Sequence, residues 1–459
     1  MTKIIITIGL FLIAVATSAQ KPLPLLKISA NKRYFQTADG KPFFWLGDTG
    51  WLLFTKCSRE EAIQYLKTRR QQGFNVVQVM VLHTLRAANV YGDSALVNGD
   101  IAKPKTEQQG VIGHDYWSHI DFVINEAAKR GIYLALVPVW GSNVKEGKVS
   151  VAQAGVYARF LAEYYGKYNN IIWLNGGDIK GSDGLEVWNT IGTTIKKYDH
   201  KHLVGFHPRG RTSSSEWFQQ APWLDFNMFQ SGHKDYAQDT SSNEQHHFGE
   251  DNWKYVRADY AQTPVKPTMD GEPSYENIPH GLHDSLATRW TAADVRRYAW
   301  WSVFAGGAGF TYGESAVMQF NRMANKGANY GVNKNWTETI HAEGAGQMKY
   351  LKQLILSKRY FDRTPAQEII ADNALDRYGY IVATKGTNYA MVYTYTGRHF
   401  SVDFSKLSFK ATAAEWYNPK NGHTEAIDKF EKATVVEFNP PGDEKAGNDW
   451  VLLLQGANK

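Results

Sequence analysis

The chain alternates short apolar runs with longer helical patterns from residue 43 to residue 357, and eight such pairs follow one another. Repeated strand–helix units of this kind are typical of an α/β fold with a parallel sheet covered by helices. Eight units close naturally into a (β/α)8 barrel of the TIM type, which we predict for residues 20–360. The predicted strands are residues 43–46, 76–82, 133–139, 171–174, 203–206, 226–229, 268–269 and 309–312. The predicted helices between them include residues 59–72, 116–130, 151–165, 185–198, 253–262, 292–304 and 343–356.

An open, doubly wound sheet is the competing architecture for such a pattern. Sheets of that kind usually carry a glycine-rich phosphate-binding loop after the first strand. Here the first predicted strand runs into Gly47-Asp48-Thr49-Gly50-Trp51, which does not match such a loop. We therefore favour the closed barrel.

Beyond residue 360 the pattern changes to short segments in which apolar and polar residues alternate. Turn sequences such as Lys385-Gly386-Thr387-Asn388 separate these segments. The segments are residues 380–384, 389–395, 414–417, 434–438 and 450–454. We predict that residues 361–459 form an antiparallel β-sandwich domain appended to the barrel.

The first 19 residues have the features of a secretory signal peptide. Met1-Thr2-Lys3 precede an apolar run over residues 4–16, and Thr17-Ser18-Ala19 form a small-residue cleavage site. The apolar run is shorter than the roughly 20 residues that a membrane-spanning helix needs. We therefore predict cleavage after Ala19 and export to the periplasm or the cell exterior, without an integral membrane segment in the mature protein; an uncleaved N-terminal anchor is the alternative.

Composition narrows the classes of function further. The formal net charge is +6, and the basic residues are scattered instead of forming a stripe, so a nucleic-acid partner is not expected. Cys57 is the only cysteine, which excludes an intramolecular disulfide. The chain holds 15 Trp, 25 Tyr and 22 Phe, and aromatic faces can stack on sugars, although most such side chains pack in cores.

Two acidic residues occupy corresponding places in the predicted barrel. Asp178 follows the fourth predicted strand and Glu272 follows the seventh, each beside glycine. Catalytic residues of such barrels lie at the C-terminal ends of the strands, and glycoside hydrolysis uses two carboxyl groups that face each other across a sugar. We therefore predict that Asp178 and Glu272 are catalytic. The alternative is structural: Asp178 could cap the next helix or pair with Lys180, and Glu272 could bridge to a basic residue at the barrel rim.

Other strand ends carry side chains that suit a sugar-binding pocket. Short polar groups at fixed strand ends offer directional hydrogen bonds, and an aromatic ring offers a platform for a sugar. For the histidines, a role as hydrogen-bonded rim residues stays open, and the tryptophan could instead shield the barrel mouth. The predicted substrate-binding residues are Asp48, His83, Trp140, Asn175, His207, Gln230, Tyr275 and Glu314.

Several motifs together resemble one family of glycosidases. They are FWLGDT (residues 44–49), GFNVVQ (73–78), WLNGGD (173–178) and DGEP (270–273), with WYNP (416–419) in the tail. The whole mature chain is similar to the apiosidase-like family, glycoside hydrolase family 140, whose C-terminal domain is of a type labelled collagen-binding by analogy. The resemblance implies a retaining enzyme that releases apiose-linked side chains of the pectic polysaccharide rhamnogalacturonan II, with Asp178 as acid/base and Glu272 as nucleophile. An Asp in place of the Glu found after this strand in the wider clan is a departure, and Gly176-Gly177 give its loop the freedom to bring the shorter side chain closer.

Three alternatives stay open at this point. One is a barrel glycosidase with another sugar specificity, and one is a non-catalytic carbohydrate-binding or adhesion protein. The third is a metal-dependent hydrolase, but neither His246-His247 nor the pair His200 and His202 is convincingly directed at a site. We expect no metal and no cofactor, and a pectic oligosaccharide or polysaccharide as the binding partner.

Overall fold

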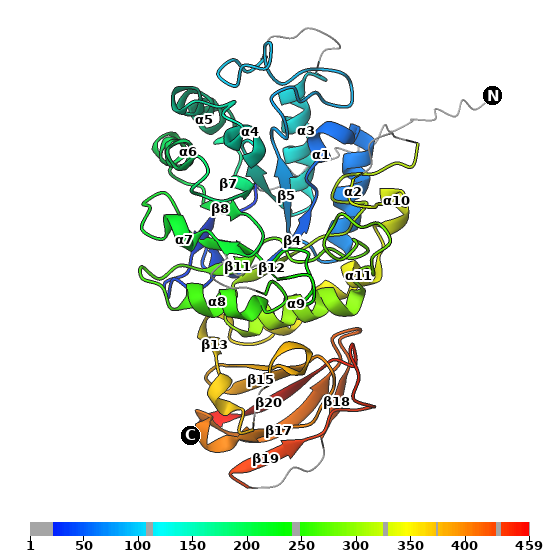
Figure 1. The fold of residues 1–459 in the computed structure, drawn as a ribbon. Coiled ribbons are helices and arrows are strands. Elements are labelled where there is room, and N and C mark those ends of the chain that lie inside the picture. The colour runs from blue at the N-terminus through cyan, green and yellow to red at the C-terminus, as the bar shows by residue number, and fades with distance from the viewer. Residues whose placement is uncertain are drawn as a thin grey trace, which may run out of the picture.

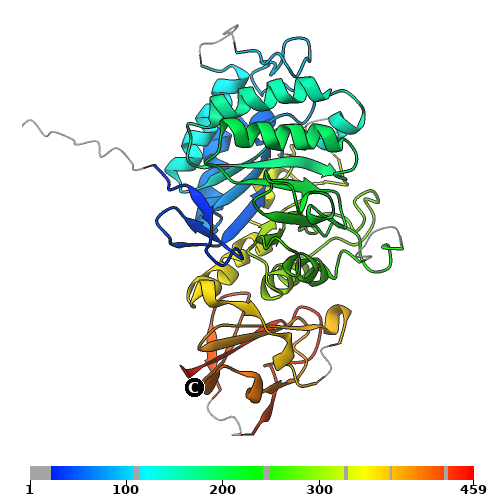
Figure 2. The ribbon, with the colours of Figure 1, turned by 90° about the vertical axis from the view of Figure 1, so that its left-hand side faces the viewer.

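The computed structural model describes residues 22–106, 113–240, 248–324, 329–372, 375–427 and 433–458. Two parts lie one above the other, a larger α/β part and a smaller part built of strands (Figures 1 and 2). The predicted signal peptide and the His246-His247 pair lie outside the described residues. Within the described ranges, no helix is long and apolar enough to cross a membrane.

Eight parallel strands form the barrel, as predicted. Neighbouring strands pair in parallel in the order β8-β7-β6-β5-β4-β12-β11-β10. A hydrogen bond of 2.8 Å from the Asp225 N–H to the Val204 carbonyl joins the β10 end to β8 and closes the ring. A ninth strand, β9 (Thr212–Ser213), pairs antiparallel with β10. The barrel strands are β4 (Trp45–Thr49), β5 (Val76–Met80), β6 (Tyr133–Val137), β7 (Ile171–Ile179), β8 (Val204–Pro208), β10 (Asn227–Gln230), β11 (Thr268–Asp270) and β12 (Gly309–Tyr312).

Helices surround the barrel, and several begin at clear sequence signals. Ser58, Ser150 and Thr291 each form a capping box at the start of a helix, which satisfies backbone N–H groups that have no partner within the helix. The bounds of α5, α6, α9 and α11 agree with the prediction. The helices are α1 (Leu53–Lys56), α2 (Arg59–Gln71), α3 (Tyr116–Lys129), α4 (Gly141–Lys145), α5 (Val151–Tyr165), α6 (Leu185–Tyr198), α7 (Ser215–Phe218), α8 (Asn252–Tyr260), α9 (Ala292–Phe304), α10 (Trp336–Thr339) and α11 (Glu343–Leu356).

The first barrel strand begins later than the sequence pattern indicated. The predicted strand at residues 43–46 spans the end of β3 (Pro42–Phe43) and the start of β4. Strand β3 belongs to a small antiparallel sheet with β1 (Leu26–Ile28) and β2 (Phe35–Thr37). Pairing with β5 and β12 extends β4 through Gly47 and Asp48, two residue types that strands disfavour, because tertiary pairing overrides local propensity. Asp48 therefore lies within the strand and not after it.

The C-terminal part consists of two antiparallel sheets packed on a common apolar core. The larger sheet has six strands in the order β13-β14-β15-β20-β17-β18, and β16 pairs with β19 in the smaller one. The strands are β13 (Thr364–Pro365), β14 (Ile381–Lys385), β15 (Tyr389–Thr394), β16 (Phe400–Asp403), β17 (Phe409–Tyr417), β18 (Thr424–Ala426), β19 (Val435–Phe438) and β20 (Trp450–Asn458). Short 3-10 turns are η1 (Tyr360–Asp362), η2 (Gln367–Ile369), η3 (Arg377–Gly379) and η4 (Phe404–Lys406).

Helices α8 and α9 lie between the barrel and the C-terminal strands (Figure 1). Trp300 of α9 stacks on Tyr393 of β15, with ring centroids 5.7 Å apart and an interplanar angle of 9°. Arg296 of α9 forms two hydrogen bonds of 2.8 and 2.9 Å with the Asp449 carboxylate, and both side chains are buried. Stacking and a bidentate ion pair both require a fixed geometry, so this interface is specific and not merely apolar.

Candidate active site

A cavity of about 510 Å³ opens at the C-terminal ends of the barrel strands. Both predicted catalytic carboxyl groups, Asp178 and Glu272, line it. Ligand sites of this size are usual for small molecules and sugars, and this end of the barrel is where active sites of the fold lie. The structure therefore places the two carboxyl groups that were predicted to be catalytic in one cavity.

Asp178 lies on an irregular stretch at the end of β7. The register between β7 and β8 shifts between Gly176 and Ile179. Gly176, Gly177 and Asp178 all have positive φ values, of 86°, 117° and 46°. A Cβ atom on Gly177 would lie 2.5 Å from the Trp140 ring, and one on Gly176 would lie 2.6 Å from the His207 carbonyl oxygen. The two glycines are thus required here, and the backbone distortion they permit directs Asp178 into the cavity.

Two histidines contact the Glu272 carboxyl group, one at each oxygen. His233 Nε2 lies 3.1 Å from Oε1, and His207 Nε2 lies 3.1 Å from Oε2. The backbone N–H of Asp178 donates to His207 Nδ1 at 3.3 Å, so the proton of a neutral His207 ring resides on Nε2 and faces Glu272. The ring of His207 therefore joins the segments that carry the two catalytic candidates.

The surroundings push the pKa values of the two carboxyl groups in opposite directions. Loss of bulk water raises the pKa of Asp178 to about 6, and the nearby negative charge of Glu272 adds to this effect. The Asp178 side chain nevertheless stays accessible from the cavity. Burial alone would raise the pKa of Glu272, but the His207 and His233 rings beside its two oxygens outweigh this effect and lower the pKa to about 2. Around pH 5, Asp178 therefore holds a proton while Glu272 is ionised.

Aromatic side chains form one wall of the cavity. Trp140 follows β6 and packs against Trp51, with ring centroids 5.2 Å apart. The Trp51 indole N–H donates to the Tyr275 hydroxyl at 3.1 Å. Burial and the Glu272 carboxylate raise the pKa of Tyr275 well above its ordinary value, so its hydroxyl stays protonated. This wall offers an apolar face for a sugar ring beside fixed hydrogen-bonding groups.

Five of the eight predicted substrate-binding residues lie at the site. His83, Trp140, Gln230 and Tyr275 line the cavity. His207 is fully buried behind Glu272 and supports the carboxyl group instead of lining the cavity.

The other three residues, Asp48, Asn175 and Glu314, are placed away from the cavity, which corrects the prediction for them. Asp48 accepts hydrogen bonds from two side chains of α2. The Asn175 amide donates to the Trp188 carbonyl of α6 at 2.8 Å. Glu314 accepts from the backbone N–H groups of Ala316 and Val317, both at 2.9 Å, and burial raises its pKa to about 7. All three side chains hold the scaffold together instead of facing a ligand.

The Asp48 carboxylate forms a fully buried ion pair with Arg69, at 2.7 Å. We expect Arg69→Met to lower the free energy of unfolding by about 3–5 kcal/mol, because Asp48 would lose its charged partner inside the protein. The double variant Asp48→Asn/Arg69→Met removes both charges and should recover part of that loss. Urea unfolding followed by circular dichroism measures both values. A loss below about 1 kcal/mol, typical of an exposed ion pair, would contradict this expectation.

Several residues of the cavity were not predicted from the sequence, and His233 is the most important of them. It comes three residues after the end of β10. Its position in the loop, and not directly after the strand, is the reason that a pattern of strand-end residues does not include it. The other missed cavity residues include Trp51, Arg209, Lys234 and Tyr330.

Of the histidines considered as metal ligands, only His200 and His202 lie in the part of the chain that the structure describes. His202 is buried, and its Nδ1 contacts the Asp199 carboxylate at 2.7 Å. Among the residues that the structure describes, no three His, Cys, Asp or Glu side chains are placed to hold a metal ion together.

Comparison with known proteins identifies the family. Residues 29–362 match the family described as "Apiosidase-like, catalytic domain", and residues 364–455 match "Putative collagen-binding domain of a collagenase". No curated protein matches the chain. A solved structure titled "Glycoside hydrolase" is 45% identical, with a TM-score of 0.90, over 95% of this chain and 98% of that one. A structure described as a glycoside hydrolase family 5 from Bacteroides vulgatus ATCC 8482 is 43% identical, with a TM-score of 0.90, over 94% of both chains. The chain therefore belongs to the apiosidase-like catalytic domain family, and its barrel is that of a glycoside hydrolase.

Proposed function

We propose that this protein is a retaining glycoside hydrolase of family 140 that releases apiose-linked side chains from rhamnogalacturonan II, acting as an endo-apiosidase. The single observation that carries a hydrolase mechanism is the Asp178–Glu272 pair in one cavity, with pKa values displaced in opposite directions. One carboxyl group that holds a proton and one that is ionised are the two groups that glycosidic bond cleavage needs. The apiosidase-like family supports the choice of sugar.

In the first step, Asp178 gives its proton to the departing glycosidic oxygen while the Glu272 carboxylate attacks the anomeric carbon. The bond to the leaving group breaks as the ester bond to Glu272 forms. His207 and His233 keep Glu272 ionised in the free enzyme, so a nucleophile is present before the substrate binds. Asp178 stays protonated in part because Glu272 is negative.

In the second step, the same coupling reverses the role of Asp178. Once Glu272 is an ester it carries no charge, and the effect that raised the pKa of Asp178 is removed. The pKa of Asp178 then falls, so the carboxylate can accept a proton from the water that attacks the intermediate. Glu272 and Asp178 both return to their starting states when the sugar leaves.

Basic side chains in the cavity lining favour an acidic polysaccharide as the substrate. Arg209 and Lys234 line it together with the aromatic wall, so basic side chains lie close to the sugar-binding space, whereas the Arg211 guanidinium group is paired with Asp239. Pectic polysaccharides are rich in acidic sugars, and electrostatic attraction favours their approach to such a cavity. A polymer of this kind stays outside the cytoplasm, in keeping with our proposal that residues 1–19 direct export. We further propose that residues 20–360 form the catalytic domain and residues 361–459 the sandwich domain.

The test is to incubate the purified protein with rhamnogalacturonan II and, in parallel, with unbranched polygalacturonic acid. We expect release of oligosaccharides that end in apiose from the first substrate only. NMR of the reaction in its first minutes should show that the anomeric configuration is retained. The Glu272→Gln variant serves as the inactive control. Cleavage confined to glycosides that contain no apiose would reject the proposed substrate.

A further inference from the structure

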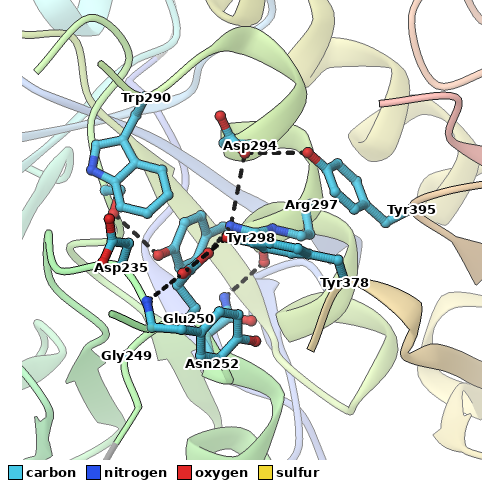
Figure 3. A network of polar contacts seen from close by, with 12 residues as sticks. Asp235, Gly249, Glu250, Asn252, Trp290, Asp294, Arg297, Tyr298, Tyr378 and Tyr395 are labelled. Carbon is cyan, nitrogen blue, oxygen red and sulfur yellow. Dashed lines mark hydrogen bonds and ion pairs between the residues drawn. The ribbon is translucent and has the colours of Figure 1, made fainter. Parts of the chain in front are cut away.

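A second buried polar network lies outside the cavity, between the barrel and the C-terminal domain. Its centre is Glu250, which is 1% exposed and precedes α8. Three donors from separate parts of the chain reach its carboxylate: Arg297 Nη2 of α9 at 2.6 Å, the Tyr236 backbone N–H at 2.8 Å, and the Tyr378 hydroxyl of η3 at 3.2 Å. Figure 3 shows Glu250 beside Arg297 and Tyr378. One of the donors thus belongs to the C-terminal domain.

Aromatic rings from both domains surround the Arg297 guanidinium group. Its Cζ atom lies 4.6 Å from the ring centroid of Tyr378 and 5.1 Å from that of Tyr395, both of the C-terminal domain. It also lies 5.1 Å from the ring centroids of Tyr298 and Trp301 on its own helix. The Tyr395 hydroxyl donates to Asp294 at 3.2 Å (Figure 3). Cation–π contacts and a buried ion pair therefore hold the position of Arg297 and Glu250 relative to the C-terminal domain.

This network fixes the segment that carries His233. Tyr236, whose N–H donates to Glu250, comes three residues after His233 on the same loop. The Tyr236 ring meets the Tyr378 ring edge to face at 5.4 Å, and Arg377 lies over it at 4.9 Å. The C-terminal domain therefore touches this loop directly at the side chain of Tyr236, and it reaches the loop backbone indirectly, through the hydrogen bond from Tyr378 to Glu250.

A second branch of the network reaches the residues on either side of Glu272. The Asn252 amide donates to Asp270 at 3.0 Å and to the Tyr298 carbonyl at 2.8 Å. Ser274 Oγ donates to the Gly232 carbonyl at 2.8 Å and lies 3.1 Å from the Tyr298 hydroxyl oxygen. Both the His233 segment and the Glu272 segment are thus anchored on α9, the helix that packs against the C-terminal domain.

We propose that the C-terminal domain helps to position the active-site residues. Tyr378 is the positioning residue, and it acts through Glu250 and Tyr236 to hold His233 against Glu272. The inference rests on the proposed function, because it assigns Glu272 a catalytic role. It gives the appended domain a task other than binding a separate ligand.

The first test compares Tyr378→Ala and Tyr378→Phe with Tyr417→Phe as the matched control. Tyr378 is 40% exposed, so its truncation leaves the core intact. Tyr417 also forms a hydrogen bond between the domains, 3.0 Å to the Tyr350 carbonyl, but outside the Glu250 network. For Tyr378→Ala we expect kcat to fall roughly tenfold with little change in KM, because a displaced catalytic group costs rate more than binding. Tyr378→Phe keeps the ring beside Tyr236 and Arg297 but loses the hydrogen bond to Glu250, so its activity should lie between that of Tyr378→Ala and that of the wild type. Tyr417→Phe, which also loses only a hydroxyl group, should behave like the wild type.

The pH dependence gives a readout that loss of stability alone would not change. The groups that act on Asp178 are Glu272, which raises its pKa, and His207, His233 and Gln230, which lower it, while Tyr275 and Tyr330 also face the pair. If His233 moves away in Tyr378→Ala, one of the lowering effects is lost. The alkaline limb of kcat/KM should then move to higher pH. An unchanged limb together with an unchanged kcat would overturn the proposal.

Hydrogen–deuterium exchange of the same variants tests the positioning without any substrate. We expect faster exchange over residues 231–239 in Tyr378→Ala and no change there in Tyr417→Phe. Exchange that stays at the wild-type rate in Tyr378→Ala would reject the proposal even if activity fell. If instead the wild type turned over no glycoside, the proposed function would fail, and the exchange result would still decide whether the C-terminal domain holds this loop.

Discussion

Replacing Glu272 with Gln is expected to lower kcat/KM roughly 10⁴-fold or more, because the residue that forms the covalent bond to the sugar is removed. Gln has nearly the same shape and can still accept a hydrogen bond from His233, which lies 3.1 Å from Oε1. The change therefore removes the nucleophile and leaves the rest of the cavity in place. Initial rates on rhamnogalacturonan II, or on an aryl glycoside that the wild type accepts, measure the loss.

The variant Glu272→Ala, with its smaller side chain, allows a test in which lost activity is restored. It leaves space at the anomeric carbon, and added azide should restore part of the turnover and produce a glycosyl azide. The control matched to Glu272→Gln is Glu314→Gln, which converts another buried carboxyl group to an amide but lies outside the cavity. We expect that control to keep near-normal activity. Near-normal activity in Glu272→Ala itself would remove Glu272 from the mechanism.

The second large effect is expected for Asp178→Asn, which should lower kcat/KM by about 10²–10⁴-fold. An amide cannot donate a proton to the departing oxygen, so substrates with poor leaving groups should lose the most. Substrates with an activated leaving group need little protonation, and their first step should be spared. A loss that is equal for both kinds of substrate would contradict the role of Asp178 as the acid.

The pH profile tests the same assignment in the wild type. Asp178 must be protonated and Glu272 ionised, so activity requires a pH below the raised pKa of about 6 and above the lowered pKa of about 2. Above pH 6, kcat/KM should fall by about tenfold per pH unit as Asp178 loses its proton. This alkaline limb should disappear in Asp178→Asn, because the group that titrates is no longer present. A limb that persists unchanged in the variant would mean that another group controls it.

Much of the fold could be predicted because it depends on patterns that are local in the sequence. The alternation of strand and helix indicated the barrel, and the capping boxes at Ser58, Ser150 and Thr291 mark where helices begin. The prediction was least accurate at the first strand, where long-range pairing and not propensity decides that Gly47 and Asp48 belong to β4. Boundaries of this kind depend on neighbouring strands that lie far away in the chain.

The candidate site could also be predicted only in part from the sequence. By itself, the sequence determined that Asp178 and Glu272 follow two barrel strands, and strands that run parallel bring their ends to one rim. Only the tertiary structure decided that Asp48 and Asn175 turn toward the surrounding helices, since both faces of a parallel barrel strand are buried and the apolar pattern does not distinguish them. Only the tertiary structure placed His233 against Glu272, because that contact depends on the path of a loop held by α9 and the C-terminal domain.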